Sequence, residues 1–260
     1  MQLAGKVAIV TGAGGGGSGQ AEALRLAREG VWVVVNDINE AGGRETVRLI
    51  EANGGRAAFF LADVGNEQQV RELIQFAETK YSGLDILVNN ASAPFGPQGP
   101  LEHWFDAIQV DLLGAMWATL YGIEAMRRRG GGAIVNIGST SAIGHGRKHS
   151  KSPGYEVAKA GVIRLTTTLG WLKEKEKIRV NCLVPSWVAT PEVKAFWDTM
   201  TPLQRREWHA PDTLISLDEL AGVVMRLVTD ETLAGRVMVW WNGEPPRLIP
   251  VVDPGYAALE

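Results

Sequence analysis

Tyr155 and Lys159 stand four residues apart in the segment YEVAK, inside a stretch, 154–175, whose apolar residues recur with helical spacing. On a helix, residues with this spacing share a face, so the ammonium group lies beside the phenol. Tyrosine is a poor base at neutral pH because its unperturbed pKa is about 10. An ammonium group about 4 Å away contributes about 4 kcal/mol in a partly desolvated site, enough to lower that pKa by about three units. The pair is therefore a candidate for general acid–base catalysis, with a solvated surface pair as the alternative.

A glycine run supplies the second candidate site. The stretch GAGGGGSG, 12–19, follows a predicted strand and opens a predicted helix. Glycine at this density indicates that some group approaches the backbone closely. The N–H groups and the dipole at a helix N-terminus favour phosphate. We therefore expect this turn to hold a pyrophosphate, with a flexible structural turn as the alternative.

Asp37 makes the phosphate prediction more specific. It ends the next predicted strand, about 20 residues after the glycines, where a carboxylate can accept hydrogen bonds from an adenosine ribose. The same carboxylate would repel the 2′-phosphate of NADP, and neither Ile38 nor Asn39 supplies a compensating cation. We expect NAD as the cofactor rather than NADP. A role for Asp37 as N-cap of a helix over 40–53 is compatible with ribose binding.

The elements that must position these residues alternate along the chain. Short β-branched runs predict strands at 6–11, 31–37, 57–63, 84–90, 132–139, 178–184 and 236–241. Helical patterns lie at 19–29, 40–53, 67–80, 103–128, 154–175 and 217–229. The strands are apolar on both faces, which is typical of a parallel sheet covered by helices on both sides. The pattern predicts one α/β domain over 1–260, a Rossmann-type doubly wound parallel sheet of about seven strands in a three-layer α/β/α sandwich.

Composition excludes several classes of function. The chain has 260 residues, a net charge of -3 and a pI near 5.9, which argues against a nucleic-acid-binding protein. No apolar run is long enough to span a membrane and no export signal is evident, so we expect a cytoplasmic protein without a membrane partner. Cys182, the single cysteine, is expected to be buried, and the four histidines show no ligand spacing, so no metal is assigned.

Taken together, the motifs resemble the short-chain dehydrogenase/reductase family over residues 3–243. Tyr155 and Lys159 match the family's Tyr-x-x-x-Lys, and NIGSTSAIG matches the segment of its catalytic serine. Ser139 aligns best with that serine, and Ser141 is the alternative. The resemblance implies that Ser139 holds the substrate oxygen, Tyr155 acts as general acid or base, and Lys159 lowers the Tyr155 pKa and binds the nicotinamide ribose.

The resemblance also assigns cofactor positions. The family pattern Thr-Gly, three residues, Gly-x-Gly contains one extra residue here, which we interpret as an insertion that leaves Gly17 and Gly19 in the family positions. The ungapped alternative places Gly16 and Ser18 there. Asp63 and Val64 match adenine contacts, and Val188 and Thr190 match residues near the nicotinamide carboxamide and phosphate. The cofactor-binding residues implied are Gly12, Gly17, Ser18, Gly19, Asp37, Asp63, Val64, Asn90, Tyr155, Lys159, Val188 and Thr190.

Several positions depart from the family pattern. Asp111 replaces an asparagine that joins a proton relay partly through its main-chain carbonyl, and we include it among the catalytic residues. Ser92 replaces the glycine of Asn-Asn-Ala-Gly, Ser186 replaces a glycine after the sixth strand, and 241–246 replaces a Gly-Gly ending. The basic segment 144–151 is interpreted as an exposed loop or as a contact for an anionic part of the substrate.

The longest irregular section, 186–216, is predicted to be a substrate loop or lid. Its aromatic residues are Trp187, Phe196, Trp197 and Trp208. They indicate an apolar or aromatic substrate surface, or they pack the lid onto the domain. The tail, 244–260, lacks periodicity and is expected to lie across a neighbouring subunit. Family members pair through the helices matching 103–128 and 154–175, which implies a homodimer or homotetramer.

The function expected from these observations is hydride transfer between NAD(H) and a secondary alcohol or its ketone, with Tyr155 as general acid or base. Two alternatives remain open: a catalytically silent NAD-binding regulator or scaffold, and a lyase or epimerase on the same fold. The sequence fixes neither the substrate, nor the physiological direction, nor the stereochemistry.

Overall fold

The computed structural model describes residues 1–93, 104–143 and 152–251. These residues form an eight-stranded sheet in the order β3-β2-β1-β4-β5-β6-β7-β8. Its strands are β1 (Val7–Thr11), β2 (Trp32–Asp37), β3 (Arg56–Leu61), β4 (Ile86–Asn89), β5 (Gly132–Ile137), β6 (Ile178–Pro185), β7 (Val237–Trp240) and β8 (Arg247–Leu248). The first seven are parallel, and β8 is antiparallel to β7. The doubly wound parallel sheet predicted from the sequence is confirmed, with each predicted strand within two residues of the observed ends.

The eighth strand was not predicted. Arg247 pairs with Val239 and Leu248 pairs with Met238, inside the tail 244–260, whose sequence shows no periodicity. These two residues extend the sheet of their own chain. Because β7 would otherwise be the sheet edge, its backbone groups are available for a partner. A strand of two residues is too short to produce any periodicity in the sequence. Residues 252–260 lie outside the described part of the chain.

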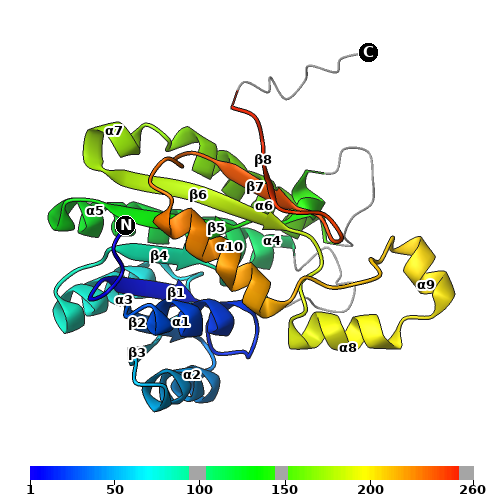
Figure 1. Ribbon diagram of the computed structural model, residues 1–260, viewed down its shortest axis with the longest axis horizontal. Coiled ribbons are helices and arrows are strands. Elements are labelled where there is room, and N and C mark those ends of the chain that lie inside the picture. Colours follow the sequence, from blue (N-terminus) through cyan, green and yellow to red (C-terminus); the bar gives the residue numbers. More distant parts are fainter. Residues whose placement is uncertain (94–103, 144–151, 252–260) are drawn as a thin grey trace.

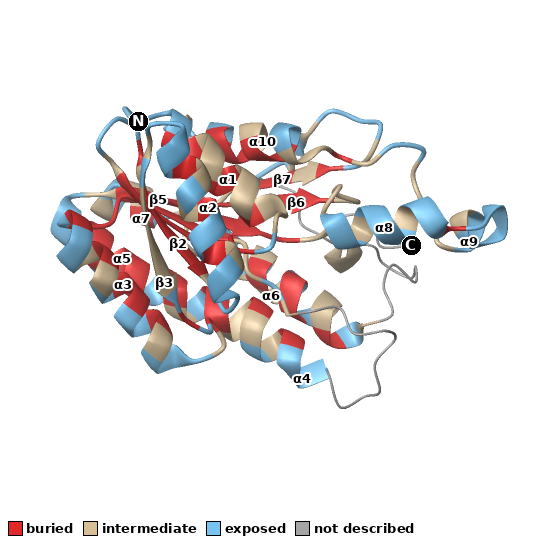
Figure 2. Cartoon of the chain, turned by 90° about the horizontal axis from the view of Figure 1, so that it is seen from below, coloured by how far each residue is buried: buried red, intermediate tan, exposed pale blue. Residues whose placement is uncertain are grey.

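Helices cover both faces of the sheet (Figure 2). One layer contains α1 (Ser18–Arg28), α2 (Glu40–Ala52) and α10 (Leu217–Thr229), and the other contains α3 (Glu67–Tyr81), α5 (Ala115–Arg129) and α6 (Pro153–Thr168). The buried residues of each helix line the side turned toward the strands. Apolar side chains such as Leu26 and Leu220 fill one interlayer space, and Leu73 and Met126 fill the other. This is the three-layer arrangement expected for strands that are apolar on both faces.

Two predicted helices are divided in the structure. The segment predicted as 103–128 consists, over its described part, of α4 (Trp104–Ala107), the π-helix η2 (Ile108–Gly114) and α5. The segment predicted as 154–175 consists of α6 and the short α7 (Leu172–Glu176). The second break falls at Gly170, whose missing side chain leaves room for Gly235, because a Cβ there would lie 3.3 Å from the Gly235 Cα.

The section 186–216 is more regular than expected. It contains α8 (Pro191–Thr199) and α9 (Pro202–Glu207), which lie beyond the carboxyl ends of the strands (Figure 1). Both helices begin with a threonine N-cap followed by proline, at Thr190 and Thr201. This Thr-Pro pair is a helix-start signal that was present in the sequence.

Cys182 is buried in β6, as expected. Burial raises the pKa of its thiol to about 12, so it packs as a small apolar side chain. Among the described residues, no helix combines the length and apolar character needed to cross a bilayer. Within the same ranges, no group of three or more histidine, cysteine or carboxylate side chains could hold a metal. His145 and His149 lie outside those ranges, as does His103.

Candidate active site

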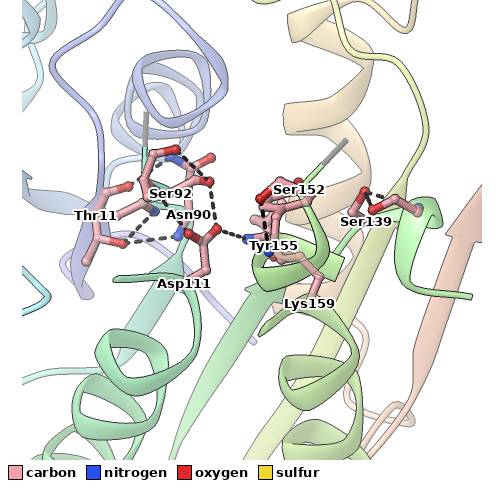
Figure 3. A network of polar contacts seen from close by, with 12 residues as sticks. Thr11, Asn90, Ser92, Asp111, Ser139, Ser152, Tyr155 and Lys159 are labelled. Atoms are coloured by element: carbon pink, nitrogen blue, oxygen red, sulfur yellow. Dashed lines mark hydrogen bonds and ion pairs between the residues drawn. The ribbon is translucent and has the colours of Figure 1, made fainter. Parts of the chain in front are cut away.

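The predicted site residues come from segments that end at the same edge of the sheet. The glycine turn follows β1, Asn90 follows β4, Ser139 follows β5 and Val188 follows β6. The strand order reverses between β1 and β4: strands β2 and β3 are added on one side of β1, and strands β4 to β7 are added on the other side. Ligands of doubly wound folds bind at such a switch point. Figure 3 shows the polar side chains gathered there.

Helix α6 carries the Tyr155–Lys159 pair into this edge. Ser152 is its N-cap and accepts a hydrogen bond from the Tyr155 N–H at 3.4 Å, and Pro153 occupies the first turn. The Lys159 side chain is 4% exposed, and its Nζ donates to the Ile137 carbonyl at 3.0 Å. Nζ lies 5.5 Å from the centre of the Tyr155 ring. The four-residue spacing thus places the ammonium group beside the phenol.

Asp111 makes the closest charged contact of Lys159. Its Oδ1 lies 3.0 Å from Lys159 Nζ, and its side chain is fully buried (Figure 3). Ser92 Oγ donates to the same oxygen at 2.6 Å, and the Ala93 N–H donates to Oδ2 at 3.0 Å. The resemblance implied that Asp111 contributes partly through its main-chain carbonyl. In the structure, its side chain is itself part of the site.

Close helix packing makes this ion pair possible. A Cβ on Gly161 of α6 would lie 2.7 Å from a methyl of Leu112 in η2, and a Cβ on Gly154 would collide with the Trp104 carbonyl. The two glycines therefore let α6 approach α4 and η2 closely. A π-helix also widens the turn that holds Asp111, and such turns are frequent at functional sites.

The pair changes the acid–base properties of both partners. Burial lowers the pKa of Lys159 most, but the charge and hydrogen bond of Asp111, together with smaller contributions from Tyr155 and Cys182, outweigh it, and the pKa is raised. For Tyr155, burial raises the pKa most, Lys159 lowers it, Asp111 raises it and a hydrogen bond with Ser139 lowers it. The effect of Lys159 on the Tyr155 pKa therefore has the expected direction, but the net direction is upward because burial outweighs it and Asp111 opposes it. The sequence did not indicate how strongly the phenol is buried.

Of the two candidate serines, Ser139 is the one whose side chain acts on the Tyr155 phenol, and it lowers the Tyr155 pKa. It follows β5 and caps the short 3₁₀ turn η3 (Thr140–Ala142), where its Oγ accepts from the Ser141 N–H at 3.3 Å. The Ser139 and Ser141 hydroxyls lie 3.0 Å apart. The two candidates are therefore adjacent, and Ser139 faces the phenol.

The glycine turn has the features of a phosphate cradle. Within the described residues, Gly17 is the N-cap of α1 and no side chain caps its first turn, whereas α2 is capped by Asn39 and α3 by Asn66. A Cβ on Gly17 would lie 3.7 Å from Thr190 Cγ2, so the segment after β6 borders the same space. The free N–H groups of α1 suit the pyrophosphate of a dinucleotide, and the residues present fit that group.

Two further glycines of the turn are required by packing. Gly12 has a φ of +67°, and a Cβ on Gly19 would collide with the Gly12 carbonyl. Gly17 at the N-cap and Gly19 in the first turn are the positions that the insertion reading assigns to the motif.

Asp37 ends β2 and lies beside the glycine turn. Its Oδ2 accepts from the Gly14 N–H at 2.7 Å, and its Oδ1 accepts from the Asn39 N–H at 2.8 Å. The N-cap of α2 is Asn39, which accepts from the Gly42 N–H, so an N-cap role for Asp37 is wrong. The carboxylate instead ties the extra-long glycine turn to the end of β2.

The remaining predicted cofactor residues border the same edge. Ser18 Oγ donates to Asn90 Oδ1 at 2.7 Å, and Asn90 Nδ2 donates to the Thr11 carbonyl at 2.9 Å. This joins the start of α1 to the ends of β1 and β4. Asp63 accepts from the Gly65 N–H at 2.8 Å within its own loop, and the following Val64 is buried.

Val188 and Thr190 shape the start of the lid. Val188 forms a parallel bridge with Ile215, and Thr190 caps α8 by accepting from the Val193 N–H. Asn242 holds the two ends of the section 186–216 together. Its Oδ1 accepts from the Trp187 N–H at 3.0 Å, and its Nδ2 donates to the Thr213 carbonyl at 3.0 Å. The basic segment 144–151 lies outside the described residues.

A buried polar ladder fixes α6 against the sheet; the resemblance of 89–92 to a sheet-supporting motif pointed to Asn89, but Asn136 and Thr166 were not predicted to take part. Asn89 Nδ2 donates to Asn136 Oδ1 at 2.8 Å, and Asn136 Nδ2 donates to Thr166 Oγ1 at 2.9 Å. The available signal was an asparagine near the end of two otherwise apolar strands. A satisfied buried network of this kind specifies one position for the helix.

Comparisons with known proteins agree with this geometry. The model of the short chain dehydrogenase family matches residues 6–201. A cyclohexanol dehydrogenase from Acinetobacter sp. (strain SE19) is 32% identical over 87% of this chain and 88% of its own. A cis-4-hydroxycyclohexanecarboxylate dehydrogenase from Sinomonas cyclohexanicum is 36% identical over 72% of this chain and 75% of its own.

A solved structure from Burkholderia xenovorans, described as a short-chain dehydrogenase/reductase, is similar over the whole fold. It has a TM-score of 0.81 and 32% identity, and the match covers 92% of this chain and 96% of that one. The chain therefore belongs to the short-chain dehydrogenase/reductase family. It is an oxidoreductase of that family, whose members use NAD(P).

Proposed function

We propose that this protein transfers a hydride between NAD(H) and a secondary alcohol or its ketone. The observation that carries the proposal is the placement of Tyr155, Lys159 and Ser139 at one edge of the sheet, beside the uncapped start of α1. The side chains needed to bind a hydroxyl oxygen and to move its proton lie beside the elements that suit a dinucleotide.

Each residue has a distinct role in this proposal. When bound, NAD supplies the hydride acceptor, and NADH supplies the donor. Ser139 hydrogen-bonds the substrate oxygen and holds it against Tyr155. In oxidation, the carbinol C–H bond gives up a hydride and the phenolate takes the hydroxyl proton, which leaves the ketone. In reduction, the phenol donates its proton to the carbonyl oxygen, and Lys159 offsets the phenolate charge that remains.

We propose NAD rather than NADP as the cofactor. Gly12, Gly17 and Gly19 would let the pyrophosphate approach the start of α1, and Asp37 would accept hydrogen bonds from the adenosine ribose. A 2′-phosphate would face the same carboxylate, and no cation among the described residues contacts Asp37. Asp63, Val64, Asn90, Val188 and Thr190 complete the proposed site.

We propose a cyclic secondary alcohol as the substrate class. Three lid aromatics pack on one another: Trp187 stacks on Phe196 with ring centres 6.3 Å apart, and Trp208 meets Phe196 edge-on at 5.5 Å. The Phe196 side chain is still 40% exposed. A flat apolar surface of this kind suits a ring better than a polar chain. The two relatives described above are named for cyclohexane alcohols.

We also propose a homodimer or homotetramer formed through α5 and α6. Apolar side chains remain exposed along these helices and the adjoining α4, namely Phe105 (75%), Met116 (42%), Leu120 (51%) and Val157 (60%). Exposed apolar groups that cluster on neighbouring elements are typical of subunit contacts. Size-exclusion chromatography with light scattering tests this, and a stable monomer would contradict it.

The proposed function is tested with a panel of cyclic and straight-chain secondary alcohols and ketones of equal carbon number. Each is incubated with NAD or NADH, and the absorbance of reduced nicotinamide is followed. We expect turnover with NAD(H) and a higher kcat/KM for the cyclic members. Phe196→Ala should reduce that preference, while the matched control Leu203→Ala, an exposed residue on α9, should leave it unchanged. Binding of NAD without turnover of any substrate would contradict the proposal.

A further inference from the structure

The Asp111–Lys159 ion pair is unusually enclosed. The two side chains are 0% and 4% exposed, and the distance between their charged atoms is 3.0 Å. Ser92, Ala93 and Ile137 supply the remaining hydrogen bonds to the carboxylate and the ammonium group. Both charges are therefore held in one geometry with little access to water, where electrostatic interactions are stronger than at a surface.

Two of the departures from the family pattern, Ser92 and Asp111, lie together in this cluster. Ser92 stands after β4 and Asp111 stands in η2, yet Ser92 Oγ donates directly to Asp111 Oδ1 at 2.6 Å. A glycine at position 92 would leave that carboxylate oxygen without this hydroxyl donor. An asparagine at position 111 would remove the negative charge. The serine and the aspartate thus form one unit that introduces a buried anion beside Lys159.

Few other charged groups act on Tyr155. On the described elements packed around it, the titratable side chains are Asp106 of α4, Asp111 of η2, Arg179 and Cys182 of β6 and, on α6 itself, Glu156, Lys159 and Arg164. Of these, Lys159 and Asp111 influence the phenol, and their effects are opposite in sign. The ammonium and carboxylate charges beside Tyr155 therefore oppose each other, and the effect of the ammonium group is the larger of the two.

We propose that Asp111, held by Ser92, is a positioning residue that offsets the positive charge of Lys159, so that Tyr155 keeps its proton at neutral pH and the Ser92–Asp111 unit sets the pH range of turnover. The consequence for catalysis rests on the proposed function. A phenol that keeps its proton is ready to donate it in carbonyl reduction, whereas alcohol oxidation requires the phenolate and is displaced to alkaline pH. The upward shift of the Tyr155 pKa has the same direction.

The titration of Tyr155 tests this inference without substrate or cofactor. The full chain is labelled with ¹³C at the ζ carbon of its four tyrosines, and Tyr155→Phe identifies the Tyr155 signal. The signal is followed from about pH 6 to about pH 11. In the wild type we expect a midpoint at or above the ordinary tyrosine value of about 10. In Asp111→Asn we expect a midpoint lower by about one pH unit or more, because the Lys159 charge then acts unopposed.

Asp85→Asn is the matched control. Asp85 is another buried carboxylate with an ion pair and a backbone N–H donor, but it precedes β4 at the opposite end of the strand. Its replacement should leave the Tyr155 midpoint unchanged. An equal shift in both variants, or no shift in Asp111→Asn, would overturn the inference.

Two further results keep the inference separate from folding defects and from the proposed function. If Asp111→Asn does not fold, the neutral variant Asp111→Ser is titrated instead: a midpoint below that of the wild type supports the inference, and an unchanged midpoint overturns it. A wild-type midpoint near pH 7 overturns the inference with either variant. If the wild type turns over no alcohol or ketone, the proposed function fails while the titration still decides the role of Asp111. If the wild type is active, the pH profile of alcohol oxidation should lie at lower pH in Asp111→Asn than in the wild type. The difference should equal the difference between the Tyr155 titration midpoints of the two proteins.

Discussion

Buried carboxylates at the two ends of β4 illustrate how one kind of contact serves different purposes. At the amino end, Asp85 accepts from Lys6 Nζ at 2.8 Å and from the Val7 N–H at 2.9 Å, and Arg129 Nε lies 3.5 Å away. At the carboxyl edge, Asp111 pairs with Lys159. The cations differ most: Lys6 and Arg129 are each 36% exposed, whereas Lys159 is 4% exposed.

The difference in cation exposure has a physical consequence. Lys6 and Arg129 remain hydrated, so their pairing with Asp85 mainly ties β1 and α5 to the start of β4. Lys159 is desolvated and faces a phenol, so a change in its partner alters proton affinity in the site. We therefore propose that the pair at the amino end contributes to stability and that the pair at the carboxyl edge contributes to chemistry.

The largest expected effect that separates the two ends is that of Tyr155→Phe. Removal of the hydroxyl eliminates the proton donor and acceptor at the carboxyl edge, and turnover should fall by about 10³-fold or more. NAD affinity and the melting temperature should stay close to the wild-type values. Steady-state kinetics, isothermal titration calorimetry and thermal melting provide the three readouts. Retention of more than about a tenth of the turnover would contradict the assignment.

Asp85→Asn should show the opposite pattern. Loss of the buried charge weakens the bonds to Lys6 and Val7 and should lower the free energy of unfolding by about 1–3 kcal/mol. The kcat of the folded enzyme should not change, because the substitution lies at the other end of the strand. Urea unfolding and kinetics on the same preparation check both statements. A large fall in kcat with unchanged stability would remove the distinction between the two ends.

Glu22 of α1 sharpens the comparison because it is a buried carboxylate with no hydrogen-bond partner among the described residues. Burial raises the pKa of Glu22 well above its ordinary value, so the folded protein holds a proton that the unfolded chain releases. The stability from this proton is complete below the unfolded pKa of about 4.3 and is lost as the pH rises toward the folded value.

Glu22→Gln should remove this pH dependence. The variant should be more stable than the wild type by about 1–2 kcal/mol at about pH 8, and by less at about pH 5. Urea unfolding at both pH values measures the difference. A stability gap that is the same at both values would show that Glu22 does not hold a proton in the folded state.

The smallest expected effect concerns Asp37, a half-buried carboxylate at the carboxyl edge. Asp37→Ala should weaken NAD binding by about tenfold, or about 1.4 kcal/mol, and should narrow the preference for NAD over NADP. Calorimetry with both dinucleotides measures the two affinities. The neighbouring Asn39→Ala is a control for disturbance of the glycine turn, because Asn39 Nδ2 donates to the Gly14 carbonyl. An unchanged preference in Asp37→Ala would contradict the cofactor proposal.

The sequence predicted the features that depend on local patterns. Alternating apolar strands and helices gave the sheet, and the spacing of Tyr155 and Lys159 gave their shared helical face. These follow from continuous apolar β-branched runs and from the helical period of 3.6 residues, both of which a short window reveals.

The features that were missed depend on contacts between distant segments. The side chain of Asp111 reaches Lys159 only because η2 is a π-helix and because Gly154 and Gly161 let α6 come close. No local pattern indicates that geometry, and none shows how strongly Tyr155 is buried, which is the main cause of its raised pKa. The pairing of Arg247 and Leu248 with β7 was missed because a strand of two residues leaves no periodicity in the sequence.

The central claim is that Tyr155 and its neighbours support hydride transfer from a carbinol carbon. The most direct measurement uses a cyclic secondary alcohol that carries deuterium on that carbon, incubated with the protein and NAD. Mass spectrometry of the recovered nicotinamide cofactor should show one deuterium in NADH and none when Tyr155→Phe replaces the wild type. Product formed with no deuterium in the cofactor pool, or no reduced cofactor with any alcohol, would contradict the claim.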